Sequence, residues 1–303
     1  MLVGNSIRIS RILKDTWKVD LFMIASCTAA YFFHFFLLSR HFDIPTIVPT
    51  VLGTAIAFFI GFNNNQAYDR WWEARRVWGA LVNDSRSWAR DILTYFSSET
   101  MNKEAISDLQ KEMINRHIAF LYLLKSSLRS IEDEDYRKYI SEEEAVAVNK
   151  HSNRHNAILH LQSKRLKEAY DGGLIDGYQF LQMDALLVKF TDEMGMSERI
   201  KNTVFPTTYS YLTKVFIWLF VMAIELVTVQ SMGVWSIGMS WLIGFVFVST
   251  QINGMSLVNP FENISVGIPL NQITRTIEIN LLQMMGAKNT PEAVKPLHGE
   301  YVL

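Results

Sequence analysis

The stretch from Gly53 to Trp78 passes from an apolar run into a charged, tryptophan-rich run without an intervening proline. Within it, Thr54, Phe58 and Phe62 follow one another at intervals of four residues, and this spacing places all three on one face of a helix. The polar residues 63–66 come next. The pattern predicts one continuous helix that crosses a membrane and extends beyond it. Phe58 and Phe62 form a row on this helix, called the aromatic row below. The row fits the lining of a pore, and it also fits a buried seam in a helix bundle.

Four apolar segments are candidates for crossing a bilayer, which takes about 20 residues in a helix. They lie at 19–38, 44–62, 215–229 and 234–257, and charged residues are concentrated between the second and the third. We therefore predict an all-α membrane protein with four transmembrane helices per subunit and long helical extensions. The expected parts are a cytosolic N-terminal segment (1–18), helices 1 and 2 (19–62), a cytosolic helical region (63–214), helices 3 and 4 (215–257) and a cytosolic helical tail (258–303).

Lysine and arginine near the ends of the spans predict the orientation, because short cytoplasmic flanks are enriched in these residues. Four basic residues precede the first span and three follow the second, at positions 8, 11, 14, 18, 70, 75 and 76. The connection from Thr228 to Ser236, between the third and fourth spans, carries no charge. Both termini and the middle region are therefore expected in the cytoplasm, in a multi-pass protein of an inner or plasma membrane.

The charged region has apolar residues at helical spacing and almost no alternating strand pattern. Helices are predicted over 71–96, 103–128, 142–170 and 178–195. Trp71, Trp72 and Trp78 lie on the extension of the second span. They either cover an interface between subunits, as exposed aromatic patches often do, or pack within their own subunit against the helix over 103–128.

Composition and motifs exclude several classes of function. The formal net charge of −1 argues against a nucleic-acid partner. Cys27 is the one cysteine and lies within the first span, which rules out a disulfide framework and a cysteine metal site. His151, His155 and His160 lack the spacing of a metalloprotease, and we interpret them as part of a solvated helix face. With no nucleophile or phosphate-binding motif, the chain is expected to be no enzyme and to hold no metal or cofactor.

Polar residues inside the spans are costly and tend to face a cavity or a partner. Glu225 lies near the expected outer end of the third span. It is interpreted either as a pore group or as an interfacial carboxylate that reaches the headgroups. Gln251 and Asn253 in the fourth span are interpreted as residues that form hydrogen bonds between helices.

Three segments of the sequence resemble the bestrophin family, in its prokaryotic branch. The first, 60–79, reads IGFNNNQAYDRWWEARRVWG and carries a Gly-Phe pair followed by an Arg-Trp-Trp cluster. The second, 204–211, is the proline-containing approach to the third span. The third, 259–282, begins with the turn Asn259, Pro260 and Phe261. The resemblance extends over 19–285 and includes the order of the spans.

This resemblance implies a homopentameric ion channel in which the second helix of each subunit lines a narrow hydrophobic neck. The family's neck positions fall on Thr54, Phe58 and Phe62. The neck would open onto a polar zone and a cytosolic vestibule with a lower aperture. The polar zone corresponds to Asn63, Asn64, Asn65 and Gln66, and the candidates for the aperture are Ile175, Gly177 and Tyr178.

The same resemblance bears on the ion and on gating. Animal bestrophins bind calcium at an acidic run after the Asn-Pro-Phe turn, whereas Glu262 is the one carboxylate here, and calcium takes six to eight oxygen ligands. A channel for small monovalent ions that is not gated by calcium is expected. A ring of five Phe side chains can gate a pore by dewetting. As the permeant ions we favour anions such as chloride. A sodium-type cation channel and a membrane-anchored helical scaffold or sensor are the alternatives. The expected partners are further copies of the chain, the lipid bilayer and the permeant ions.

Overall fold

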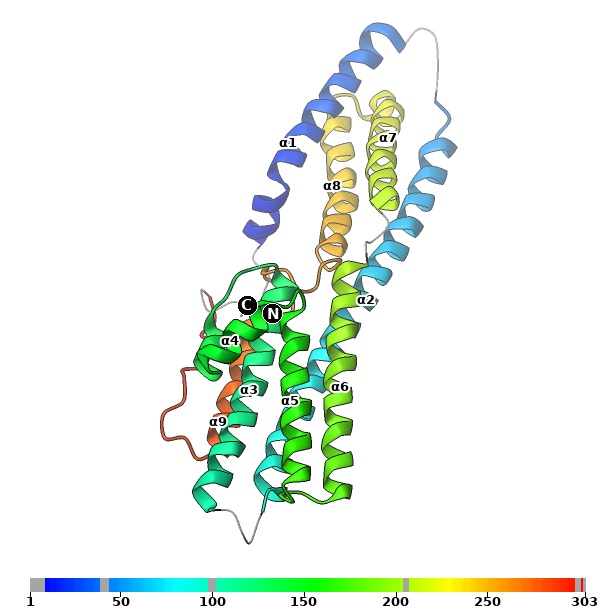
Figure 1. Ribbon diagram of the computed structural model, residues 1–303. Coiled ribbons are helices and arrows are strands. Elements are labelled where there is room, and N and C mark those ends of the chain that lie inside the picture. The colour runs from blue at the N-terminus through cyan, green and yellow to red at the C-terminus, as the bar shows by residue number, and fades with distance from the viewer. Residues whose placement is uncertain (1–8, 39–43, 98–101, 204–206, 298–300, 302–303) are drawn as a thin grey trace. The chain divides into compact units, whose positions relative to one another are not determined.

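A computed structural model gives the structure of residues 9–38, 44–97, 102–203, 207–297 and 301. These residues form helices, with one isolated antiparallel bridge between Leu297 and Tyr301. In chain order the elements are α1 (Ile9–Phe33), the π-helical turn η1 (His34–Leu38), α2 (Ile47–Tyr95), α3 (Lys103–Arg129), the 3₁₀ turn η2 (Asp135–Tyr139), α4 (Glu142–Asn149), α5 (Arg154–Asp171), α6 (Gly177–Asn202), α7 (Thr207–Met232), α8 (Trp235–Met255) and α9 (Leu270–Met284) (Figure 1). The prediction of an all-α fold is confirmed for the part of the chain that is described.

The four predicted spans match four helices that are long and apolar enough to cross a membrane. These are Thr16–Phe36, Ile47–Tyr95, Thr208–Met232 and Trp235–Met255. The second is also the helix predicted over 71–96, because α2 runs unbroken over 49 residues. Residues 1–8 of the predicted N-terminal segment, the loop 39–43 and residues 204–206 of the proline-containing approach lie outside the described residues.

The prediction of one helix over 142–170 is wrong, because the chain forms two helices there. Ser141 caps α4 by accepting a hydrogen bond from the Glu144 amide at 3.2 Å. Asn153 caps α5 by accepting from the Asn156 amide at 2.9 Å. Such caps satisfy backbone amides that have no partner within the first turn of a helix. Asn153 therefore starts a new helix where the apolar spacing alone suggested continuity.

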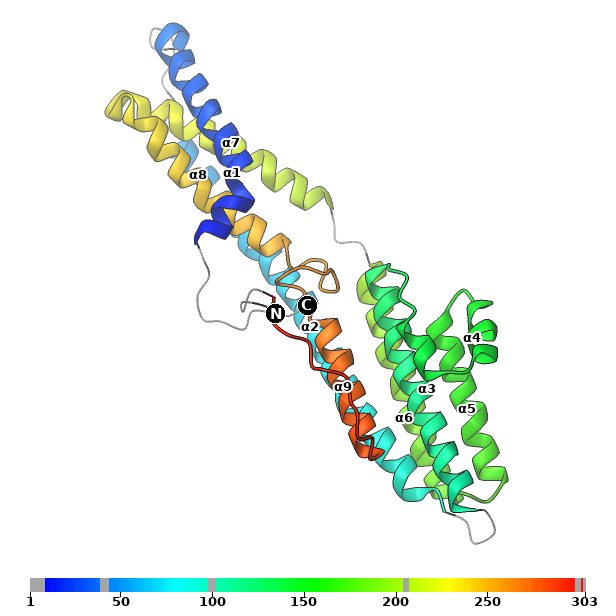
Figure 2. The same cartoon turned by 90° about the vertical axis from the view of Figure 1, so that its left-hand side faces the viewer.

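The chain divides into two compact units. The spanning unit contains α1, η1, α2 up to Trp71, α7 and α8. The charged unit contains α2 from Trp72 onward, α3 to α6 with η2, and α9. Figure 2 shows the helices of both units from a second direction.

The spanning unit has a core in which glycines permit close helix packing. Helices within a bilayer associate through packing of this kind rather than through the hydrophobic effect. A Cβ atom added at Gly244 of α8 would lie 2.4 Å from the Met23 sulfur and 2.7 Å from Val221 Cγ2. A Cβ added at Gly53 of α2 would lie 2.7 Å from Cε2 of Phe220. Any larger residue at these positions would therefore force a side chain of α1 or α7 to move.

Two histidines belong to the interior of the charged unit. His117 is fully buried with Nε2 2.8 Å from Ser85 Oγ, and burial lowers the pKa of His117 to about 3, so its ring is neutral. The interpretation of a solvated histidine face is wrong for His155, which is buried with Nε2 2.7 Å from Glu198 Oε1. It is correct for His151 and His160, which are exposed.

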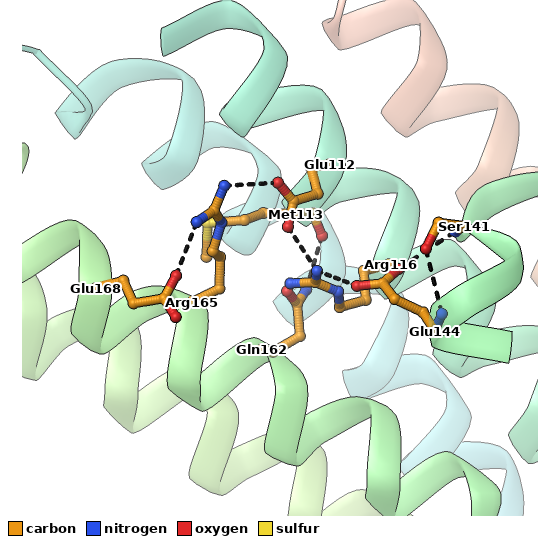
Figure 3. A network of polar contacts seen from close by, with 8 residues as sticks. All are labelled: Glu112, Met113, Arg116, Ser141, Glu144, Gln162, Arg165 and Glu168. Carbon is orange, nitrogen blue, oxygen red and sulfur yellow. Dashed lines mark hydrogen bonds and ion pairs between the residues drawn. The ribbon is translucent and has the colours of Figure 1, made fainter. Parts of the chain in front are cut away.

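An ion-pair network joins α3, α4 and α5 within the charged unit (Figure 3). The buried Arg116 contacts Glu112 at 2.5 Å and also pairs with Glu144. Arg165 bridges Glu112 at 2.8 Å and Glu168 at 2.7 Å. Because a buried charge is costly unless it is paired, this network ties the three helices together at one place.

Candidate pore helix

The two sides of α2 differ sharply in burial within the spanning unit. Ile56 and Ile60 are 1% and 4% exposed and pack in a core with residues of α7 such as Phe220. Phe58 and Phe62 are 72% and 53% exposed. The aromatic row is therefore not a buried seam of the chain's own bundle, and lipid, a second protein surface or water must contact it.

Thr54 is exposed on the same face as Phe58 and Phe62, one turn before Phe58. Its hydroxyl donates to the Thr50 carbonyl oxygen at 2.9 Å. The methyl group and the acceptor lone pairs of Thr54 are left for whatever contacts this face. The helix thus presents a row that changes from hydroxyl to aromatic over two turns.

The four polar residues after Phe62 separate into two pairs. Asn63 is buried, and its Nδ2 donates to Thr213 Oγ1 of α7 at 3.3 Å. Asn64 donates from Nδ2 to the Thr250 carbonyl oxygen of α8 at 3.2 Å. Asn65 and Gln66 are exposed. The first pair anchors α2 to its neighbours, and the second pair continues the exposed face.

Asp69 is a residue of this face that the sequence pattern indicates but that our sequence analysis missed. It lies seven residues after Phe62 and is exposed. Seven residues are two helical turns with a drift of about 20°, so Asp69 extends the aromatic row. The signal was the heptad spacing from Phe62, and it places a carboxylate below the apolar positions.

Glu225 lies inside the bundle, which contradicts both interpretations of this residue. Its side chain is fully buried, and Oε1 accepts a hydrogen bond from Ser236 Oγ of α8 at 2.6 Å. It is therefore neither an interfacial carboxylate nor a pore group of this chain. The interpretation of Gln251 is confirmed, because its Nε2 donates to the Ser210 carbonyl oxygen of α7 at 3.2 Å. Asn253 is exposed.

The candidates for the lower aperture lie at the start of α6. Ile175 is 5% exposed, whereas Tyr178 is 88% exposed, and Gly177 is also exposed. Asp176 caps α6 by accepting from the Gln179 amide at 2.8 Å. Exposure therefore favours Gly177 and Tyr178 over Ile175 for a role that requires contact with an aqueous path.

The turn after the fourth span is compact. Phe261 is 3% exposed, and the Ile268 amide donates to the Pro260 carbonyl oxygen at 2.7 Å. Asn259 Nδ2 donates to Glu262 Oε1 at 2.7 Å. Among the described residues no three His, Cys, Asp or Glu side chains are grouped as a metal site requires. The carboxylate of Glu262 thus accepts a hydrogen bond within the turn in which it lies.

The tryptophans of α2 are not equivalent. Trp78 is fully buried in its own chain, so the alternative of packing within the subunit is correct for Trp78. Trp72 is 45% exposed, and Trp71 is half-buried. An interface between subunits thus stays a prediction for Trp71 and Trp72.

Four helices are long and apolar enough to cross a membrane, and one of them, α2, carries the exposed Phe58 and Phe62. The sequence profile of a family described as "Bacterial/Fungal Bestrophin protein" matches residues 5–283. The chain belongs to the bestrophin family, in its bacterial and fungal branch. The expectation of a channel rather than an enzyme is thereby confirmed, because this is a family of channels.

Individual relatives agree with this assignment. The Voltage-dependent anion channel-forming protein YneE of Escherichia coli strain K12 is 29% identical over 253 residues, which cover 83% of this chain and 81% of the relative. The Voltage-dependent anion channel-forming protein RSc3414 of Ralstonia nicotianae is 28% identical over 240 residues, covering 78% and 76%. The crystal structure of a bacterial bestrophin homologue from Klebsiella pneumoniae superposes with a TM-score of 0.82 at 25% identity, covering 89% of this chain and 98% of the homologue.

Proposed function

We propose that this chain forms a homopentameric channel that conducts small monovalent anions such as chloride. The observation that carries the proposal is the exposure of Phe58 and Phe62 on a membrane-spanning helix whose other side is packed. Five copies of this face around one axis make a hydrophobic neck, which gates by dewetting. Relatives named as anion channel-forming proteins support the choice of ion.

In this arrangement Thr54 forms the outer ring of the neck, and Phe58 and Phe62 form the aromatic rings. Asn65 and Gln66 lie at the inner mouth, while Asn63 and Asn64 hold the helix in place behind it. Gly177 and Tyr178 are the positions for the lower aperture. Both termini face the cytoplasm, as the distribution of lysine and arginine favours. The family is one of channels, so we set aside the interpretation as a scaffold or sensor.

A sodium-type cation channel is the second candidate, and Asp69 is the observation that favours it. Five exposed carboxylates two turns below Phe62 would attract cations to the inner mouth, as acidic rings do in cation channels. Aromatic rings contribute with either sign, since their edges are positive and their faces negative. The sign of the reversal potential separates the two candidates.

The assembly itself should be a pentamer. Cyclic symmetry places the same face of every subunit around one axis. The aromatic residues of α2 that a monomer would expose are then enclosed within the ring. Native mass spectrometry of the detergent-solubilised protein should show five copies as the dominant species. A dominant monomer or dimer would remove the pore and with it the proposed function.

Conduction should not depend on calcium. Glu262 is the one carboxylate between Asn259 and Gly267, and it already accepts a hydrogen bond from Asn259. Calcium requires six to eight oxygen ligands, so this turn is a poor site for it. Currents in planar bilayers should be the same in excess chelator and in micromolar calcium. Loss of current in chelator with recovery on adding calcium contradicts this prediction.

A further inference from the structure

Directly below the aromatic row, a side chain of α2 occupies a notch in α8. Asn64 Nδ2 donates to the Thr250 carbonyl oxygen at 3.2 Å. One turn further along α8, a Cβ atom added at Gly254 would lie 1.7 Å from Asn64 Oδ1 and 2.2 Å from Asn64 Cγ. The Asn64 side chain therefore fills the space that any residue other than glycine at position 254 would need.

The neighbouring residue makes a second attachment in a different direction. Asn63 Nδ2 donates to Thr213 Oγ1 of α7 at 3.3 Å, and that hydroxyl donates in turn to the Tyr209 carbonyl oxygen at 2.7 Å. Consecutive residues of a helix point about 100° apart. Two attachments at this angle, one to α7 and one to α8, fix the rotation of α2 about its own axis.

We propose that Asn64 and Gly254 are positioning residues that set the rotation of α2 and so aim Phe58 and Phe62. Phe62 lies two residues before Asn64, and Phe58 lies one turn before Phe62 on the same face. Any rotation of α2 about its axis at Asn64 also rotates the Phe58 and Phe62 side chains, because the intervening helix is unbroken. This inference rests on the proposed function, since it assumes that the aromatic row lines the pore.

The substitution Gly254→Ala tests the notch, with Gly238→Ala as its matched control. Both glycines lie in α8, but a Cβ atom added at Gly238 meets nothing within 4 Å. Both alanines favour the helix equally. In Gly254→Ala the Asn64 side chain is displaced and its bond to Thr250 is lost. One lost hydrogen bond shifts a two-state equilibrium by about three- to tenfold.

The direct readout is the accessibility of the row, which a change in stability alone would not move. Cys27 is the one cysteine of the chain, so Cys27→Ala gives a background without thiols. In this background, Phe58→Cys should react with a membrane-impermeant charged thiol reagent in the pentamer. Gly254→Ala should slow this reaction by up to about tenfold, the largest change that the loss of one hydrogen bond allows, and Gly238→Ala should leave it unchanged. Equal rates in the two glycine variants would overturn the inference.

Asn64→Ala keeps the test informative if Gly254→Ala does not assemble, because it removes the hydrogen bond without a clash. It should slow the labelling of Phe58→Cys as well. In the Asn64→Ala background, Gly254→Ala should then add nothing, since the space is free, whereas independent effects would add. Additive effects overturn the inference. If the wild type does not conduct, the proposed function fails. Labelling in the pentamer still decides whether the contact between Asn64 and Gly254 sets the rotation of α2.

Discussion

Replacing Phe58 and Phe62 together by alanine should raise ion flux by at least about tenfold, for which lowering the barrier by about 1.4 kcal/mol is sufficient. Both side chains are largely exposed on the face of α2 that faces away from the core of the spanning unit. In a ring of five they present an apolar constriction that water leaves readily. Alanine widens the constriction and removes much of its apolar surface, so the wetted state becomes easier to form.

The measurement is chloride efflux from liposomes, with Phe59→Ala as the matched control. Phe59 is 40% exposed and follows Phe58 in the chain, so it points about 100° away from the row. Its replacement removes an equal aromatic ring from the same helix. Unchanged flux in the double variant, or an equal increase in Phe59→Ala, contradicts the assignment of the neck.

Arg116→Met should destabilise the protein by about 3–5 kcal/mol, the range found when one partner of a buried ion pair is removed. The Arg116 side chain is 6% exposed and pairs with Glu112 and Glu144. Methionine keeps much of the volume but leaves Glu144 without this cation. The helices α3 and α4 then lose the ion pair that joins them (Figure 3).

The matched control is Arg165→Met in the same network. The Arg165 side chain is 36% exposed and pairs with Glu112 and Glu168, and such accessible pairs contribute about 0–1 kcal/mol. Thermal unfolding in detergent should therefore show a much larger fall in Tm for Arg116→Met than for Arg165→Met. Equal shifts would mean that burial of Arg116 does not matter.

The sequence predicted those features that depend on periodicity over many residues. The row of Thr54, Phe58 and Phe62 indicated one face of a helix, and α2 has this face exposed. The four predicted spans match four helices for the same reason, because the length of an apolar segment can be read from the sequence alone. A break decided by one cap was not predictable in this way. Asn153 starts α5 within a segment whose apolar spacing suggested a single helix.

The partners in contacts between distant parts of the chain were not predicted. Nothing in the local sequence links Asn64 to Gly254, because their proximity follows from the packing of α2 on α8. Glu225 was misplaced for the same reason, since its partner Ser236 lies beyond the turn that joins α7 to α8. His155 was taken as solvated because the segment is polar, but it is buried and forms a hydrogen bond with Glu198 of α6. Burial of a polar residue is set by its neighbours in space.

We propose that this chain conducts anions through the face of α2 that carries Phe58 and Phe62. Single-channel currents in planar bilayers, recorded with asymmetric sodium chloride, report conduction and the sign of the permeant ion together. We predict a conductance whose reversal potential lies near the chloride equilibrium potential and whose size increases in Phe58→Ala/Phe62→Ala. A reversal potential near the sodium equilibrium potential would contradict the choice of ion, and intact pentamers without any conductance would contradict conduction through this face of α2.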